Sequence, residues 1–168
     1  MSNIISIDGS QGGGQIRGQR PKPGLKRQHL TCAQAALEVG RGSADGAELN
    51  SKELVFHPGQ VRGGDYHIRI FTAGSTTLVL QAILLALMKA DKESTVTIEG
   101  GTHNPMAPPV DFLQECYLPI LHEMGAKFIL DLDRYGFAPA GGGQITAKIK
   151  PTPLKTCDLL ERGQLKSI

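Results

Sequence analysis

What the sequence lacks narrows the class of protein. The chain has 168 residues, no Trp, three Cys and no long apolar run. Its longest apolar stretch, residues 78–88, is interrupted by Gln81 and is well short of the roughly 20 residues that a membrane-spanning helix needs. The N-terminus reaches Asp8 before any apolar region develops, which is unlike a secretory signal peptide. We therefore expect a cytoplasmic protein without a membrane partner.

Recognisable catalytic and metal-binding patterns are also missing. Cys32, Cys116 and Cys157 lie far apart, form no Cys-x-x-Cys pair and have no histidine spaced to complete a zinc site. None of the five histidines falls in a metal-ligand pattern, and the sequence holds neither a Gly-x-Ser-x-Gly elbow nor evident paired carboxylates. We expect free thiols, and the sequence alone identifies no metal ligand and no catalytic residue.

Acidic residues are absent from residues 9–37, and this absence is informative. The formal net charge of the chain is only +2. The segment nevertheless carries five cations, which are Arg17, Arg20, Lys22, Lys26 and Arg27. The rest of the chain is mildly acidic, so the pattern is more consistent with a local anion site than with a broad nucleic-acid footprint.

The second half of the sequence predicts a β-α-β-α-β-β unit. Apolar and polar residues alternate over short strands, and two longer apolar patterns are typical of helices. The expected strands are 66–70, 95–98, 128–132 and 144–150, and the expected helices run from about 75 to 90 and from 109 to 124. Pro119 lies inside the second helical pattern, so we expect that helix to kink or to split.

The first half gives a shorter version of the same series. We expect a strand at 4–8, a helix at 24–39 and strands at 47–49 and 53–57. One helix and one strand are missing relative to the second unit, close to Ile16-Arg17. We therefore divide the chain into an incomplete first repeat at 1–60, a complete repeat at 61–150 and a linker at 151–168 toward a C-terminal part that is absent here. The Gly-Gly-Gly-Gln-Ile sequence at 12–16 recurs at 141–145, either as an echo of the repeat or by coincidence.

The basic segment at 17–29 is the clearest candidate binding site. Pro21 and Pro23 restrict the backbone just before a predicted helix, whose first N–H groups and partial positive charge favour an anion. Arginine and lysine side chains there suit phosphate oxygens. A solvated basic turn that binds nothing is the alternative. His29 lies near the helix start and either contacts the same anion or is an ordinary surface histidine.

Three other features are weaker signals. The Gly-rich run at 8–15 follows a strand and forms either an anion-binding nest or a tight turn. Gln81 is the only polar side chain in an apolar stretch, so its amide either reads the edge of a base or bonds a neighbouring backbone group. The proline-containing loop at 102–109 either packs against a flat ring or only leads into the next helix.

These motifs in combination resemble the RNA 3'-terminal phosphate cyclase family. The resemblance covers almost the whole chain and rests on residues 7–9 with 12–16, 20–25, 27–30, 46–49, 58–59 with 63–66, 73–75 with 78–81, 100–102 with 104–105 and 107–109, and 139–143. It implies an α/β (α+β) fold of repeated β-α-β-α-β-β units, each similar to the C-terminal domain of a translation initiation factor. The match at 20–29 and at Gln81 favours the catalytic, bacterial-type branch.

The resemblance also implies a reaction. ATP adenylylates an enzyme histidine, AMP passes to an RNA 3'-phosphate, and the vicinal 2'-hydroxyl displaces AMP to leave a 2',3'-cyclic phosphate. The implied cofactors are ATP and a divalent metal, Mg²⁺ or Mn²⁺, and the implied partner is an RNA 3'-phosphate end. The implied phosphate- and RNA-binding residues are Arg17, Arg20, Lys22, Arg27, Gln28 and His29, and the implied ATP-binding residues are Gln81, at the adenine-contacting position, and Pro108, against the adenine face.

Three departures from the family pattern qualify this expectation. The Gly-rich loop lacks the acidic residue that helps to hold the metal, a helix and a strand are missing at Ile16-Arg17, and the family's nucleophilic histidine lies beyond residue 168. We therefore expect that this chain alone forms no adenylylated intermediate.

Two other functions stay open: a non-catalytic, cyclase-like ribosome-assembly factor, and a fragment whose cations contact only RNA backbone. Self-association through uncovered surfaces is also left open.

Overall fold

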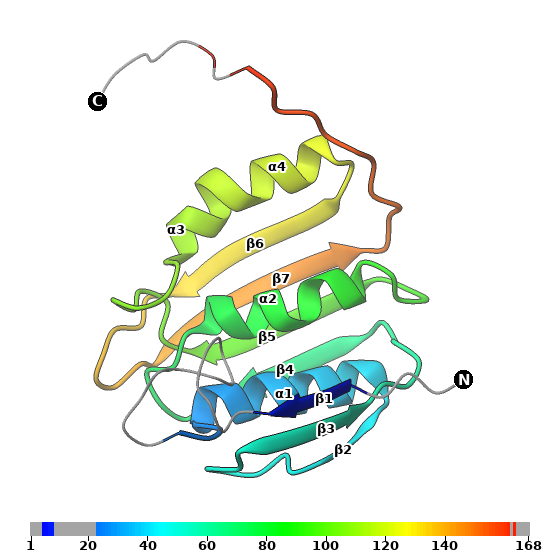
Figure 1. Cartoon of the computed structure of the whole chain (residues 1–168). Coiled ribbons are helices and arrows are strands. Elements are labelled where there is room, and N and C mark those ends of the chain that lie inside the picture. Colours follow the sequence, from blue (N-terminus) through cyan, green and yellow to red (C-terminus); the bar gives the residue numbers. More distant parts are fainter. Residues whose placement is uncertain (1–4, 9–22, 162, 164–168) are drawn as a thin grey trace.

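The fold is a mixed α/β arrangement with two sheets (Figure 1). The computed structural model describes residues 5–8, 23–161 and 163. The first sheet has the order β1-β3-β2 and is antiparallel, with strands β1 (Ile5–Asp8), β2 (Ser43–Asp45) and β3 (Glu53–His57). The second sheet has the order β4-β5-β7-β6, with strands β4 (Asp65–Arg69), β5 (Ser94–Gly100), β6 (Lys127–Arg134) and β7 (Gly143–Lys150).

Helices cover one face of the four-stranded sheet (Figure 1). α2 (Thr76–Leu87) lies over the middle of the sheet, and α1 (Arg27–Gly40) packs against α2 and β4. A helical run made of α3 (Val110–Phe112), η1 (Leu113–Tyr117) and α4 (Leu118–Glu123) lies beside β6. Val96 and Ile98 alternate along β5 and are fully buried under these helices, as a two-residue period requires.

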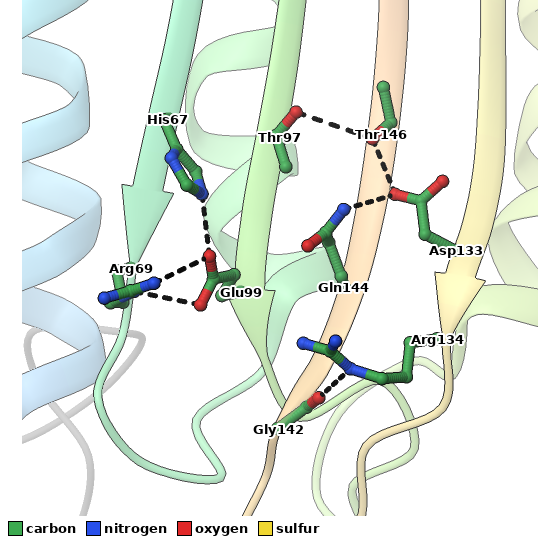
Figure 2. A network of polar contacts seen from close by, with 9 residues as sticks. All are labelled: His67, Arg69, Thr97, Glu99, Asp133, Arg134, Gly142, Gln144 and Thr146. Carbon is green, nitrogen blue, oxygen red and sulfur yellow. Dashed lines mark hydrogen bonds and ion pairs between the residues drawn. The ribbon is translucent and has the colours of Figure 1, made fainter.

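The opposite face of this sheet is open and polar (Figure 2). Arg69 and Glu99 are direct cross-strand partners, and the guanidinium donates two hydrogen bonds to the carboxylate. These bonds, together with one from His67, lower the pKa of Glu99. Asp133 accepts hydrogen bonds from Gln144 and Thr146 across β6 and β7. These side-chain pairs bond neighbouring strands to each other and so help to fix the strand register.

The order of elements predicted for residues 66–150 is confirmed, with strand ends that differ by only a few residues. The second helix is split near Pro119, as expected. The run passes from α3 through the π-helical turn η1 into α4, which has Pro119 in its first turn. Proline lacks the N–H of an ordinary helical bond and its ring crowds the preceding turn, so the wider π turn accommodates it.

Two predictions for the first half are wrong in position. No strand forms at 47–49, because Gly46, with φ of +74°, and Asn50, with φ of +65°, turn the chain there, and the strand is the polar segment Ser43–Asp45. The helix begins at Arg27 rather than at residue 24. Leu25 exchanges backbone hydrogen bonds with the 50–51 turn, so the chain is still extended at that point.

Some expectations about organisation remain predictions. Ile16-Arg17 lies outside the described residues, and nothing in the fold tests the division at residues 60 and 150 or the relation between the two units as repeats. No helix within the described residues is long and apolar enough to cross a membrane. The three cysteines are free, as expected, with Cys32 buried and Cys116 exposed.

Candidate functional site

The candidate site lies at the end of the four-stranded sheet where α1 and α2 begin (Figure 1). Three connecting segments meet there: the 70–75 turn before α2, the 101–109 loop after β5, and the 135–142 loop between β6 and β7. Gly101 N–H donates to the Gly74 carbonyl and Thr102 N–H donates to the Gly136 carbonyl. Segments far apart in the sequence are therefore bonded into one surface.

Gln28 joins the first turn of α1 to this surface. Its side-chain oxygen accepts a hydrogen bond of 2.8 Å from the backbone N–H of Ser75. Ser75 is buried and is the N-cap of α2, where its hydroxyl accepts from the N–H of Leu78. One residue from the predicted phosphate segment is thus held against the start of the helix that carries Gln81.

Gln81 and Pro108 lie on connected parts of the site. The Thr77 hydroxyl donates a 2.7 Å hydrogen bond to the Pro108 carbonyl. Gln81 follows Thr77 by four residues, so the two side chains share one face of α2. The Gln81 side chain is half-buried, and no described residue hydrogen-bonds its amide. The alternative in which this amide bonds a neighbouring backbone group is therefore wrong for the described part of the chain.

The two helix starts differ in what they offer an anion. At α2 the N–H groups of Ser75, Thr76 and Leu78 are already bonded within the protein. At α1 the N-cap is Lys26, whose ammonium has no acceptor to offer the first turn. Arg27 is exposed, and its guanidinium makes no ion pair or hydrogen bond with any described residue. The start of α1 is accordingly the end that suits an anion.

His29 is buried rather than on the surface. Its Nδ1 accepts a 3.2 Å hydrogen bond from the backbone N–H of Lys26, and only 7% of the residue is accessible. The alternative of an ordinary surface histidine is wrong because this imidazole closes the first turn of α1. A contact between His29 and a bound anion stays a prediction.

Comparison with known proteins identifies the family. Residues 14–160 match the family model described as RNA 3'-terminal phosphate cyclase. The chain belongs to the RNA 3'-terminal phosphate cyclase family. It is similar to proteins named RNA 3'-terminal phosphate cyclase from Pseudomonas fluorescens (49% identical), Koribacter versatilis (50%) and Ralstonia nicotianae (47%). These alignments cover 97%, 97% and 98% of this chain but 54%, 52% and 54% of the relatives. The chain thus spans about half their length.

The cyclase alignments also show that residues are missing inside the matched region. They extend over 183, 186 and 188 positions, whereas the whole chain has 168 residues. The relatives therefore contain residues that have no counterpart here, as the comparison of the two halves suggested. The lengths do not place the gap, so its position near Ile16-Arg17 stays a prediction.

Several cyclase-like features fall outside the described residues. These are Arg17, Arg20 and Lys22 and the Gly-rich run, of which only Asp8 is described, as the end of β1. Within the described residues, no group of three or more His, Cys, Asp or Glu side chains is placed to hold a metal ion. The described part of the site therefore presents cations and amides rather than a carboxylate cluster.

Sequence reasoning missed two residues that shape this end of the cyclase fold. The Thr102 hydroxyl is buried, and it accepts from the N–H of Gly136 at 2.9 Å while lying 3.2 Å from the carbonyl of the same glycine. Asn104 donates from its amide to the Ala73 carbonyl, and its buried Oδ1 has no partner among the described residues. The Asn-Pro dipeptide at 104–105 is a signal for a turn, but it gives no information about which distant loops the turn joins.

Proposed function

We propose that this chain forms the phosphate- and adenine-binding part of an RNA 3'-terminal phosphate cyclase. Its activity converts an RNA 3'-phosphate to a 2',3'-cyclic phosphate at the expense of ATP. The observation that carries the proposal is the bonded path from Gln28 through Ser75 and Thr77 to Pro108. That path connects the predicted phosphate segment with the predicted adenine contacts, which are distant in the sequence.

The phosphate-binding role rests on charge and on the geometry of α1. Arg27 is an exposed guanidinium, unpaired within the described part of the chain, at a helix start that lacks an acceptor side chain at the N-cap. A phosphate there would gain both a bidentate cation and the partial positive charge of the helix. Arg17, Arg20 and Lys22 precede it and add to the same charge. Gln28 acts through Ser75, since its oxygen is already engaged, and keeps α1 in place.

The adenine-binding role rests on Gln81 and Pro108. A glutamine amide offers both donor and acceptor groups, which is the pattern that complements the N6 and N7 edge of adenine. Gln81 is a half-buried residue whose amide has no partner among the described residues, one helical turn from the contact that fixes Pro108. Pro108 provides an apolar ring for the face of the base. ATP thus fits the residues that are present.

The family's divalent metal, Mg²⁺ or Mn²⁺, would screen the phosphates of ATP, but the described residues provide no carboxylate set for it. All five histidines of the chain also make a hydrogen bond to another protein group. As the resemblance implies, we propose no residue of this chain as the nucleophile that receives AMP. The RNA 3'-phosphate remains the partner, through the cations before α1.

Titration calorimetry with ATP tests the adenine site directly. We expect Gln81→Leu to weaken ATP binding about tenfold, as the loss of a good base-edge contact does, and to reduce the preference for ATP over GTP. Gln34→Leu, on the exposed side of α1, is the matched control and should leave both unchanged. Equal binding by the Gln81 variant and the unaltered chain would remove Gln81 from the site.

Incubation of the purified chain with labelled ATP and Mg²⁺ or Mn²⁺ tests the missing nucleophile. We expect ATP to bind without leaving a covalent AMP adduct, because no histidine here is proposed to attack the α-phosphate. A labelled band that survives denaturation would contradict this assignment. The labelled residue, located by peptide mapping, would then be the nucleophile.

A further inference from the structure

Three aromatic rings gather on the loops at one end of the four-stranded sheet. The rings of Tyr135 and Phe137 are parallel within 3°, with centroids 6.1 Å apart. The ring of His103 lies 5.3 Å from the first and 5.5 Å from the second. Tyr135 is 60% accessible and Phe137 is 56% accessible, so both rings are exposed to solvent. We call these three residues the aromatic platform.

The backbone under the platform is clamped. Gly136 separates the two exposed rings, and both its N–H and its carbonyl face the Thr102 hydroxyl. A Cβ at position 136 would lie 2.3 Å from the backbone nitrogen of Gly143 and 2.4 Å from the Gly100 carbonyl oxygen, so only glycine fits. The rings therefore project from a fixed backbone, so the backbone that carries them needs no ordering when a ligand arrives.

Hydrogen bonds at both ring nitrogens fix the His103 side chain. Its Nδ1 lies 2.8 Å from the Thr102 hydroxyl, and its Nε2 is hydrogen-bonded to the Asp111 carboxylate. This hydrogen bond lowers the pKa of Asp111, which therefore stays ionised as the acceptor. With both ring nitrogens occupied, the histidine contributes the face of its ring rather than a free polar atom.

The platform is continuous with the candidate site. His103 lies in the loop that also carries Pro108, and Asn104 of that loop bonds the Ala73 carbonyl just before α2. The glycine run after Phe137 returns to the same turn, since a Cβ on Gly141 would meet the Thr72 carbonyl at 2.8 Å. The platform therefore belongs to the same cluster of loops as the start of α1, where the proposed function puts the 3' end of an RNA strand.

Arg134 supplies a cation at the same end of the sheet. It directly precedes Tyr135, and its Nε donates to the Gly142 carbonyl, which anchors the guanidinium at this end of the sheet (Figure 2). No other described residue hydrogen-bonds this guanidinium. Exposed aromatic faces next to a cation are what proteins present to single-stranded nucleic acid, where bases stack and phosphates meet the positive charge.

We propose that the aromatic platform is a stacking site for an unpaired base of the RNA strand, upstream of the terminal phosphate. The proposal rests on the proposed function, which brings the 3'-phosphate end to the cations before α1. Every base has a π-face, so the platform binds the strand without reading its sequence. Arg134 contacts the phosphate next to the stacked base. The platform thereby favours single strands over duplexes, whose bases are already stacked.

The absence of tryptophan from the chain allows a direct test. Tyr135→Trp places a single indole fluorophore on the platform, and Leu160→Trp places one on a residue that is 90% accessible elsewhere. Each variant is titrated with a short RNA that ends in a 3'-phosphate and with an abasic strand carrying the same phosphates. Anisotropy of labelled strands measures binding independently, and circular dichroism confirms that each variant is folded.

We expect the RNA, but not the abasic strand, to quench the indole fluorescence of the Tyr135→Trp variant, and neither strand to quench that of the Leu160→Trp variant. Phe137→Leu, which keeps apolar area but removes the ring, should weaken RNA binding about tenfold. Binding of RNA without quenching in the Tyr135→Trp variant, or equal quenching by both strands, would overturn the platform while leaving the proposed function intact. Failure of either strand to bind by anisotropy would contradict the proposed function and the platform with it.

Discussion

The Gln28 side chain and the Ser75 backbone N–H form a 2.8 Å hydrogen bond across 47 positions of sequence. The bond ties the first turn of α1 to the N-cap of α2. It places the start of α1 beside the end of the four-stranded sheet, where the 101–109 and 135–142 loops also meet. The first turn of α1 and the helix that carries Gln81 are thereby held together.

Replacing Gln28 tests how firmly this bond holds α1. We expect Gln28→Ala to lower the free energy of unfolding by about 1–2 kcal/mol, because the Ser75 N–H would lose its acceptor in a partly buried setting. Gln34→Ala, on the exposed side of the same helix, should change it by less than about 0.5 kcal/mol. Urea titration followed by circular dichroism measures both values. Equal stability of the two variants would mean that the bond is unimportant.

The clamp under the aromatic platform predicts a glycine requirement. We expect Gly136→Ala to destabilise the chain by about 3 kcal/mol, since its Cβ would meet backbone atoms that have no room to move. Gly40→Ala, at the end of α1 with no atom within 4 Å of the new Cβ, should be neutral or stabilising by up to about 1 kcal/mol. Thermal unfolding of the two variants gives the comparison. A tolerant position 136 would show that the 135–142 loop is not fixed.

Acid stability depends on the turn before β4. The Gly63 N–H and the Arg62 guanidinium both donate to Asp91 and lower its pKa to about 2 from an ordinary 3.8. A depressed folded-state pKa stabilises the fold fully above the unfolded pKa, and this stabilisation is lost as the pH falls through the folded value. We therefore expect the unaltered chain to lose stability between about pH 4 and 2 by this route.

Asp91→Asn should remove this part of the acid dependence, because the side chain no longer binds a proton in that range. The exposed Asp158→Asn should keep it. The measurement is the unfolding midpoint in urea at a series of pH values from 2 to 5. If the unfolding midpoint falls by the same amount between pH 5 and pH 2 in Asp91→Asn and in the unaltered chain, the two hydrogen bonds to Asp91 do not stabilise the fold.

The parts of the fold that the sequence predicts are those with a strong local period. β5 alternates buried and partly exposed residues, and Ser75 caps an apolar run, so residues 66–150 are predicted almost throughout. β2 is missed because its three residues, Ser43, Ala44 and Asp45, have no apolar alternation, so no local pattern announces their pairing with β3. The start of α1 is missed because Leu25 bonds a distant turn.

The candidate site follows the same division. The cations before α1 and the isolated Gln81 stand out in the sequence because their composition is unusual. The platform does not, since His103 and Phe137 become neighbours only when β6 and β7 bring the 135–142 loop against the 101–109 loop. Contacts of this kind depend on strand order, which no short-range pattern encodes.

The central claim is that the cations leading into α1 recognise the phosphate at the end of an RNA strand. Arg20 lies in this segment, outside the described residues, and is our sequence-based choice for the contact. When a protein contacts only the RNA backbone, its affinity depends steeply on salt and does not distinguish a 3'-phosphate from a 3'-hydroxyl. A terminal-phosphate site distinguishes the two ends at every salt concentration.

The most direct measurement is the affinity of the chain for one RNA sequence with a 3'-phosphate and with a 3'-hydroxyl, over a range of salt. We predict tighter binding of the phosphate form by the unaltered chain and loss of that preference in Arg20→Ala. Equal affinities of the unaltered chain for the two ends would contradict the account. The protein would then contact only the sugar-phosphate backbone of the RNA.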